Sequence, residues 1–180
     1  MNHSSALATV PPLLLIVSGC AASDEYVRWE ATRLEANKQL VRRYYEHVVS
    51  SGDVAAVELY ISPDYVYVHE GVRHDLGIEG EKEHVLGVRR TYPDLRLTVE
   101  RKIAEGDWVA TVVKARGTHR GVWLGMKSTN KAIEVTAVNV DRVVDGRIVE
   151  HNGAANLLEP LLGIGAIRIA EPVPDDAGAE

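Results

Sequence analysis

The stretch IEVTAVNVDRVV-DG-RIVEHNGA, residues 133–154, decides the fold. Two β-rich runs, 133–144 and 147–154, stand on either side of Asp145-Gly146. Asp-Gly between two such runs is a strong signal for a tight β-hairpin. We therefore predict that the two runs form neighbouring antiparallel strands.

The sequence upstream of this hairpin supplies two more strands and most of the helices. Residues 95–99 and 108–117 alternate apolar and polar side chains around the turn Glu105-Gly106-Asp107, which predicts two further strands. Helices grouped ahead of a four-stranded antiparallel meander give an α+β layer fold. The remaining predicted elements are a long helix from 24 to about 49, a short helix 53–60, a strand 65–69, a loop 71–78, a helix 79–90 and a helical segment 157–164.

Composition limits the classes of partner. The chain has 180 residues, of which 46% are hydrophobic, which suits one domain with a substantial core. Its formal net charge is −6 and no basic stripe stands out, so we expect no nucleic-acid partner. The single cysteine excludes an intramolecular disulfide and a cysteine-based zinc site.

The first 23 residues differ from the rest. The apolar run 6–17 is shorter than the ~20 residues that span a bilayer and is typical of a signal-peptide core. It ends in Val17-Ser18-Gly19-Cys20, which resembles a bacterial lipobox in which Cys20 takes the lipid. We expect an exported lipoprotein whose only membrane contact is that anchor. The segment before the apolar run has no Lys or Arg, and the alternative is an N-terminal arm on a cytoplasmic protein.

These boundaries divide the chain into three parts. We expect a signal peptide with lipobox at 1–23, one domain at 24–168 and an acidic disordered tail at 169–180. The last ten residues contain two prolines and four acidic residues, a composition that cannot bury a core.

Short motifs over residues 37–165 resemble the SnoaL-like polyketide cyclases. Each is weak alone, but their order and spacing together are specific. They are Asn37-Lys38, Arg42-Arg43-Tyr44-Tyr45, Gly52-Asp53, Ser62-Pro63-Asp64-Tyr65, Tyr92-Pro93-Asp94-Leu95, Ala104-Glu105-Gly106-Asp107, Gly117-Thr118-His119-Arg120-Gly121, Leu124-Gly125, Arg142, Asp145-Gly146-Arg147-Ile148 and Glu150-His151. The resemblance implies a cone-shaped α+β barrel like nuclear transport factor 2, with N-terminal helices packed on a curved, mainly antiparallel sheet. It also implies a homo-oligomer with no metal and no organic cofactor.

The resemblance also implies a chemistry, from which this chain departs. Cyclases of this family close a ring in a polyketide ester by an intramolecular aldol reaction, with an Asp on the last strand moving the proton. Here Asn152 stands at the family's usual Trp position and Asn156 at the Asp position, and alternation places both on one face, which we expect to be the pocket face. A neutral amide cannot be the general base, but Asn156 could hold a carbonyl or stabilise an enolate.

His119 is then the first candidate for proton transfer, because a histidine titrates near neutral pH. The alternative is a structural hydrogen bond that holds the loop after its strand. Tyr45, Tyr65, Trp123, Asn152 and His69 are the predicted pocket residues. For His69 a place on the rim is an equal alternative, and the aromatic residues could instead be packing residues.

We expect two other polar residues to lie away from the pocket. Alternation places His151 on the sheet surface or at an interface, and we expect Asp141 to face solvent, although it could replace the missing base if it points inward. The sequence therefore favours a cofactor-free cyclase or isomerase acting on an apolar, oxygenated, polyketide-like molecule. The alternative is a non-catalytic small-molecule-binding lipoprotein on the same fold. An open apolar sheet face also predicts a homodimer that packs sheet to sheet.

Overall fold

A computed structural model describes residues 18–123, 125–168 and 170 of the chain, with side chains from residue 23 onward. The chain divides into two units, 1–33 and 34–180, which are described separately below. Most of the expected signal peptide and of the acidic tail lies outside the described residues. None of the helices that the structure describes is long and apolar enough to cross a membrane.

The described part of the first unit is helical and belongs to α1 (Ser18–Arg43). Cys20 lies in this helix, but its side chain is outside the described residues. Tyr26 and Trp29 are exposed, and the guanidinium of Arg33 lies 5.5 Å from the centre of the Trp29 ring. These contacts are local to one helical face.

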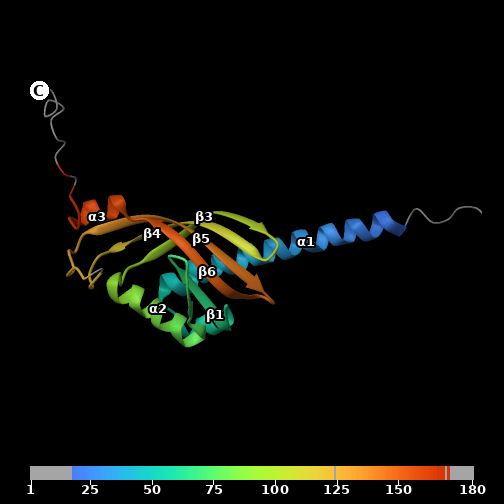
Figure 1. Cartoon of the computed structure of the whole chain (residues 1–180), viewed down its shortest axis with the longest axis horizontal. Coiled ribbons are helices and arrows are strands. Elements are labelled where there is room, and N and C mark those ends of the chain that lie inside the picture. Colours follow the sequence, from blue (N-terminus) through green and yellow to red (C-terminus); the bar gives the residue numbers. More distant parts are fainter. Residues whose placement is uncertain (1–17, 124, 169, 171–180) are drawn as a thin grey trace, which may run out of the picture. The chain divides into compact units, whose positions relative to one another are not determined.

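The second unit follows the predicted order of helices and strands, shown in Figure 1. After the end of α1 come η1 (Tyr44–Val49), η2 (Val54–Leu59), β1 (Ile61–His69), β2 (Val72–Asp75), α2 (Gly77–Thr91), β3 (Arg96–Glu105), β4 (Trp108–Thr118), β5 (Ala132–Val144), β6 (Arg147–Asn156) and α3 (Leu158–Ile164). Asp53 caps η2 as predicted, because its side chain accepts a hydrogen bond from the Ala56 backbone N–H.

One strand was missed. Residues 71–78 were expected to be a loop, but Val72–Asp75 form β2 and pair with the end of β1. The turn between them is Glu70-Gly71, and both residues have positive φ (50° and 79°). That backbone is the one a two-residue hairpin turn requires, yet Glu-Gly lacks the Asn-Gly or Asp-Gly signature of such turns.

The six strands form one mixed sheet in the order β2-β1-β6-β5-β4-β3. β3 to β6 are the expected antiparallel meander, and β1 joins β6 in parallel. The α+β class and the mainly antiparallel sheet are confirmed, although the sheet is open rather than closed into a barrel. Figure 1 shows α2 beside β1 and α3 at the end of β6.

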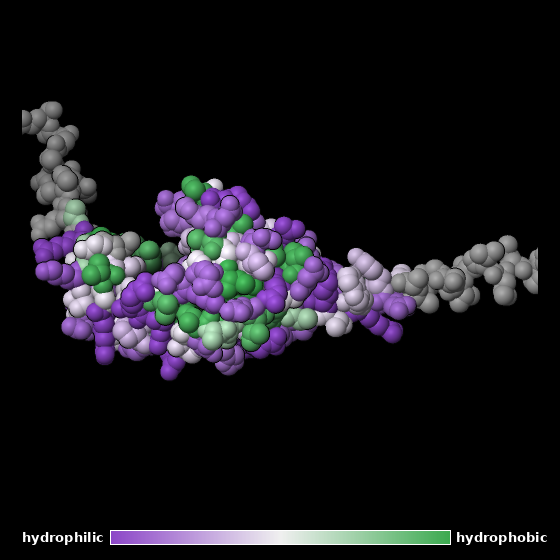
Figure 2. All heavy atoms as spheres, turned by 90° about the horizontal axis from the view of Figure 1, so that it is seen from below, coloured by the Kyte–Doolittle hydropathy of each residue, from purple (hydrophilic) through white to green (hydrophobic). Residues whose placement is uncertain are grey.

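The core lies between the helices and one face of this sheet. Its largest fully buried apolar residues are Ile61, Ile148, Val41, Val48, Val57, Val85, Val109 and Val143. Figure 2, which views the molecule from the side where α2 and β1 lie in Figure 1, shows apolar and hydrophilic side chains intermixed on the surface. The inner face of the sheet therefore supplies the main buried apolar layer, and the site forms where this layer is incomplete.

Candidate functional site

A cavity of about 330 Å³ lies between the helices and the inner face of the sheet. That volume is within the range of small-molecule sites. It is lined by Tyr44, Tyr45, Val49, Tyr65, Tyr67, Glu81, His84, Val85, Val88, Tyr92, Leu95, Leu97, Ala115, Trp123, Ile133, Val135, Ala137, Asn139, His151, Ala155 and Leu157.

The lining combines an apolar wall with a few titratable groups. A packing cluster built on Tyr92, Leu95, Ile133 and Val135 provides much of the apolar part. The polar groups come from helix α2, the turn η1 and strands β1, β5 and β6. An apolar pocket with a small number of convergent polar groups is the usual form of a ligand or active site.

The turn η1 (Tyr44–Val49) places two tyrosine hydroxyls at this cavity. It is a π-helical turn, which is wider than an α-helical turn and brings consecutive side chains closer to one face. Tyr44 and Tyr45 are both buried, and each reaches a different carboxylate. Tyr44 donates to Glu81 on α2, whereas Tyr45 donates to Asp141 on β5 at 2.8 Å.

Asp141 and His151 form a hydrogen-bonded pair, with His151 in the cavity wall and Asp141 buried behind it. Asp141 is 1% exposed, and its Oδ1 lies 2.8 Å from His151 Nδ1 while its Oδ2 accepts from Tyr45. His151 lines the cavity and stacks on Tyr67 with ring centres 5.5 Å apart. Because Asp141 and Tyr45 occupy Nδ1, the second ring nitrogen, Nε2, is the one available to a ligand.

A β-bulge brings this pair together. Val143 pairs with Ile148, but the next pair is Arg142 with Glu150, so Val149 has no partner on β5. The extra residue shifts the alternation of β6 by one place. As a result Ile148 points into the core, and beyond the bulge it is His151 that pairs with the inward-facing Asp141.

The local charges set the protonation of these groups. Burial would lower the pKa of His151, but its hydrogen bond to Asp141 and the negative charges of Asp141 and Glu81 outweigh burial, so the pKa is raised above 6.5. Burial and the adjacent Asp141 hold the pKa of Tyr45 well above 10, and burial with Glu81 does the same for Tyr44. Both phenols therefore remain proton donors to their carboxylates.

Comparison with known proteins shows which family the chain belongs to. The family model for SnoaL-like polyketide cyclases matches residues 39–162. This chain belongs to the SnoaL-like polyketide cyclase family. It is 29% identical over 133 residues to the nogalonic acid methyl ester cyclase of Streptomyces nogalater, with 72% of this chain and 94% of that protein covered.

Solved structures of Streptomyces proteins agree with this assignment. IdmH from Streptomyces antibioticus, provisionally assigned as a polyketide cyclase, is 32% identical, and the TM-score is 0.61 over 72% of this chain and 98% of IdmH. AclR from Streptomyces galilaeus, provisionally assigned as a hydroxylase, is 26% identical with a TM-score of 0.66 over 75% of this chain and 99% of AclR. The SnoaL-like membership supports a cyclase or isomerase role.

Three of the residues predicted for a SnoaL-like pocket line the cavity: Tyr45, Tyr65 and Trp123. His69 does not. It is exposed at the end of β1, with its ring stacked on that of Tyr67 at 6.0 Å, so it lies beside the lining rather than in it.

The two amides lie on the face opposite to the one expected. Asn152 and Asn156 are exposed and absent from the lining, because the bulge at Val149 turns His151 inward instead. The side chain of Asn156 accepts a hydrogen bond from the backbone N–H of Leu158 at the start of α3. A role of Asn156 in catalysis stays a prediction.

His119 is fully buried but does not line the cavity. Its Nδ1 lies 3.1 Å from the Thr129 hydroxyl, and its backbone pairs with Lys131 and Asn130, so it fastens the two ends of one loop. Its ring is 6.0 Å from that of Trp123. These contacts match the structural alternative, and its catalytic role stays a prediction.

The residues that sequence reasoning placed elsewhere are His151 and Asp141, and those it did not consider for the site are Glu81 and Tyr44. A signal for Asp141 was present. On β5 the alternate positions 133, 135, 137 and 143 are all apolar, so Asn139 and Asp141 interrupt one apolar face of the strand. Among the described residues, no group of three His, Cys, Asp or Glu side chains is arranged to hold a metal ion.

Proposed function

We propose that this SnoaL-like protein is a cofactor-free cyclase or isomerase that acts on a neutral, oxygenated, polyketide-like molecule. The observation that supports this most strongly is the Asp141–His151 pair, held by Tyr45 at the wall of an apolar cavity. A histidine whose Nδ1 is fixed by a buried carboxylate presents Nε2 as a proton acceptor in a defined orientation.

The proposed reaction is an intramolecular aldol ring closure. His151 Nε2 removes a proton from a carbon between two carbonyl groups, and Asp141 stabilises the resulting imidazolium. The carbanion attacks a second carbonyl carbon of the same molecule, which forms the new C–C bond and an alkoxide. The alkoxide takes back a proton from His151, so the product has the same composition as the substrate.

The charges around the cavity favour a neutral substrate. Glu81 lines the cavity and Asp141 lies behind His151, whereas the described lining residues include no Lys or Arg. A free carboxylate would meet the charge of Glu81, and the imidazolium that His151 can form is already paired with Asp141, so an ester or ketone is the better fit. The relative from Streptomyces nogalater is named for an ester, which agrees with this inference.

Ring closure by purified protein tests the proposal. Nogalonic acid methyl ester is the first substrate, and liquid chromatography with mass spectrometry follows the appearance of an isomer of unchanged mass. His151→Ala should reduce the rate by ~10²–10⁴-fold, the usual contribution of a general acid–base group. His74→Ala is the control, an exposed histidine of β2 outside the cavity lining, and should keep most of the turnover. Full turnover by His151→Ala would contradict the assignment, and tight binding without any turnover would favour a binding protein.

We also propose that the protein is exported and lipidated at Cys20. The support is the apolar run 6–17 and the lipobox-like Val17-Ser18-Gly19-Cys20. Intact-mass measurement on protein from its native host should show a chain that begins at Cys20 and carries lipid. Cys20→Ser should remain unprocessed, and an unmodified chain that begins at Met1 would overturn this proposal.

A homodimer is the third proposal. The outer face of the sheet carries Ile103, Trp108 and Val138, which are 64%, 39% and 49% exposed. Packing two such faces together would remove them from water. Light scattering at tens of micromolar should give twice the monomer mass, and a monomer mass would refute sheet-to-sheet pairing.

A further inference from the structure

Two carboxylates lie at the cavity, Glu81 in its lining and Asp141 behind His151, and they differ in how many of their oxygens accept hydrogen bonds. Both oxygens of Asp141 have partners, Tyr45 on Oδ2 and His151 on Oδ1. Glu81 Oε1 accepts from Tyr44, but Glu81 Oε2 is buried without a hydrogen-bond partner among the described residues. Both oxygens of Asp141 therefore have hydrogen-bond partners within the protein, whereas one oxygen of Glu81 has none among the described residues.

Glu81 is placed to use that acceptor on a ligand. It projects from α2, is 4% exposed and lines the cavity. Burial and the neighbouring Glu81 raise the pKa values of Tyr44 and Tyr65, so both phenols remain protonated. The Tyr44 hydroxyl holds the carboxylate through Oε1, whereas His84 Nδ1 lies 3.6 Å from Oε2, beyond hydrogen-bond distance.

A buried carboxylate oxygen without a donor is costly, because it has lost its water and gained no hydrogen bond. A ligand that fills the cavity can supply the missing donor. It must then carry an O–H or N–H group, because a carbonyl or an ether oxygen would set two acceptors against each other.

We propose that Glu81 Oε2 is a binding subsite for a hydroxyl group of the substrate, at the end of the molecule that is held away from His151. This inference rests on the proposed function for its choice of substrate, a neutral hydroxylated ester or ketone. Tyr44 and Tyr45 are consecutive residues of one turn, and they hold Glu81 and Asp141 respectively. Glu81 and the Asp141–His151 pair are thus fixed relative to each other, so a hydroxyl bound at Glu81 sets the position of the reacting carbon before His151. Glu81 acts here as a positioning and specificity residue.

Binding of a matched pair of small esters tests the subsite without any turnover. The probes are methyl 6-hydroxy-2-naphthoate and methyl 6-methoxy-2-naphthoate, which differ only in whether the oxygen can donate. Isothermal titration calorimetry at neutral pH gives the ratio of their dissociation constants. Wild type should bind the hydroxy ester ~10- to 100-fold more tightly, as expected for a hydrogen bond to a charged group. Equal affinities in the wild type would overturn the proposal, and that result needs no variant.

Three variants assign the preference to Glu81. Glu81→Gln should reduce the ratio to ~3-fold or less, because the amide can place a donor where the free oxygen was. Glu79→Gln makes the same substitution on an exposed side chain of the same helix and should leave the ratio unchanged. His84→Gln should also keep the ratio, and its loss there would show that the imidazole, not Glu81, recognises the hydroxyl.

The ring-closure assay separates this proposal from the one on which it rests. A wild-type protein that prefers the hydroxy ester but closes no ring would keep the subsite and refute the cyclase activity. A protein that closes rings but binds both esters equally would keep the activity and refute the subsite. Circular dichroism of each variant confirms that it is folded before the ratio is interpreted.

Discussion

Asp141→Asn measures how strongly the buried carboxylate holds the site. Asp141 is 1% exposed and accepts from the Tyr45 hydroxyl and from His151 Nδ1, each at 2.8 Å. Asn has the same size but one acceptor oxygen, and its amide group would face a donor. One charge-assisted hydrogen bond is lost and the other becomes neutral. With ~1.5–3 kcal/mol for a bond to a charged group and ~0.5–1.5 kcal/mol for a neutral one, the free energy of unfolding should fall by ~2.5–4.5 kcal/mol where His151 is protonated.

The loss should depend on pH in a defined direction. The pKa of His151 is raised in the folded protein above its unfolded value of 6.5, so folding binds its proton more tightly. The stabilisation by the Asp141–His151 ion pair is therefore complete below pH 6.5 and disappears as the pH rises through the folded pKa. The difference between wild type and Asp141→Asn should be largest in acid and smaller in alkali.

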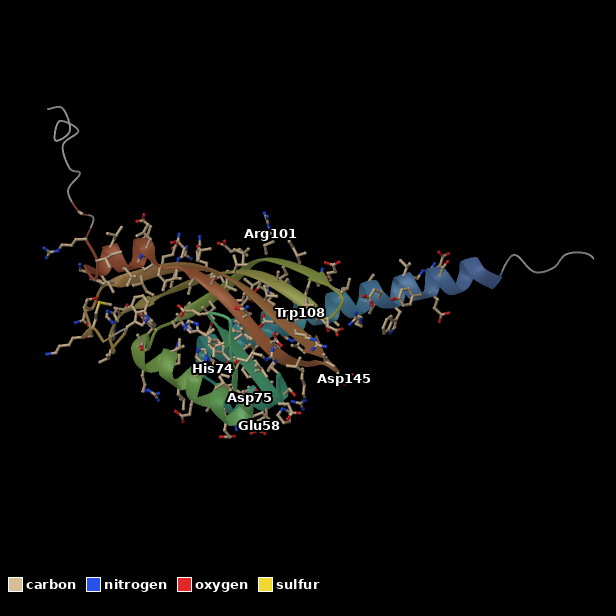
Figure 3. All side chains as sticks on the ribbon, in the orientation of Figure 1. Glu58, His74, Asp75, Arg101, Trp108 and Asp145 are labelled. Atoms are coloured by element: carbon tan, nitrogen blue, oxygen red, sulfur yellow. The ribbon has the colours of Figure 1, made fainter. Side chains whose placement is uncertain are left out.

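Urea denaturation followed by tryptophan fluorescence at about pH 5.5 and about pH 9 gives this difference. The control is Asp145→Asn, the same substitution at the exposed tip of the β5–β6 hairpin, which Figure 3 labels. Asp145 has φ of 50°, a conformation that Asn adopts readily, so this variant should stay close to wild type. The reasoning is refuted if Asp141→Asn costs no more than the control, or costs the same at both pH values.

Further predictions concern activity, substrate charge and packing. The kcat/KM of ring closure should rise with pH through a pKa above 6.5, since His151 accepts a proton only when neutral, and this rise should move to lower pH in Asp141→Asn; a profile without a histidine-like step would exclude His151 as the base. Calorimetry should show 6-hydroxy-2-naphthoic acid binding at least ~10-fold more weakly than its methyl ester, because the described lining holds Glu81 and no Lys or Arg, and the His151 imidazolium is already paired with Asp141; equal binding would contradict the neutral-substrate inference. Gly121→Ala should lower the thermal unfolding midpoint by several degrees. The Gly121 N–H donates to the Thr91 carbonyl at the end of α2, and a Cβ at Gly121 would clash with the backbone of Arg90 and Thr91; an unchanged midpoint would show that the loop can move aside.

The fold was largely predictable because its signals are local. Asp145-Gly146 fixed one hairpin, alternation gave the strands of the meander, and Asp53 marked the start of η2. Strand β2 was not predicted because its turn is Glu70-Gly71. Both residues have positive φ, and Glu is not a residue type that indicates such a conformation. Local patterns therefore succeeded wherever the residue type and the backbone conformation agreed.

The site was less predictable because it depends on register. A regular hairpin from Asp145-Gly146 would pair Val149 with Arg142 and Glu150 with Asp141, leaving His151 on the other face. The bulge shifts the pairing by one residue and sets His151 opposite Asp141. Neither the bulge nor the reach of Tyr45 across 96 residues of sequence to Asp141 is written in a local pattern.

Val149, which has no partner on β5, decides which residues of β6 face the cavity. With it, β6 turns His151 toward the cavity and leaves Asn152 and Asn156 outside. A strand of the same sequence that ran without the bulge would turn those two positions inward, and they are the positions that resemble the family's Trp and proton-transferring Asp. One fold can thus exchange its whole set of inward residues on this strand by a slip of register, with no substitution at any of them.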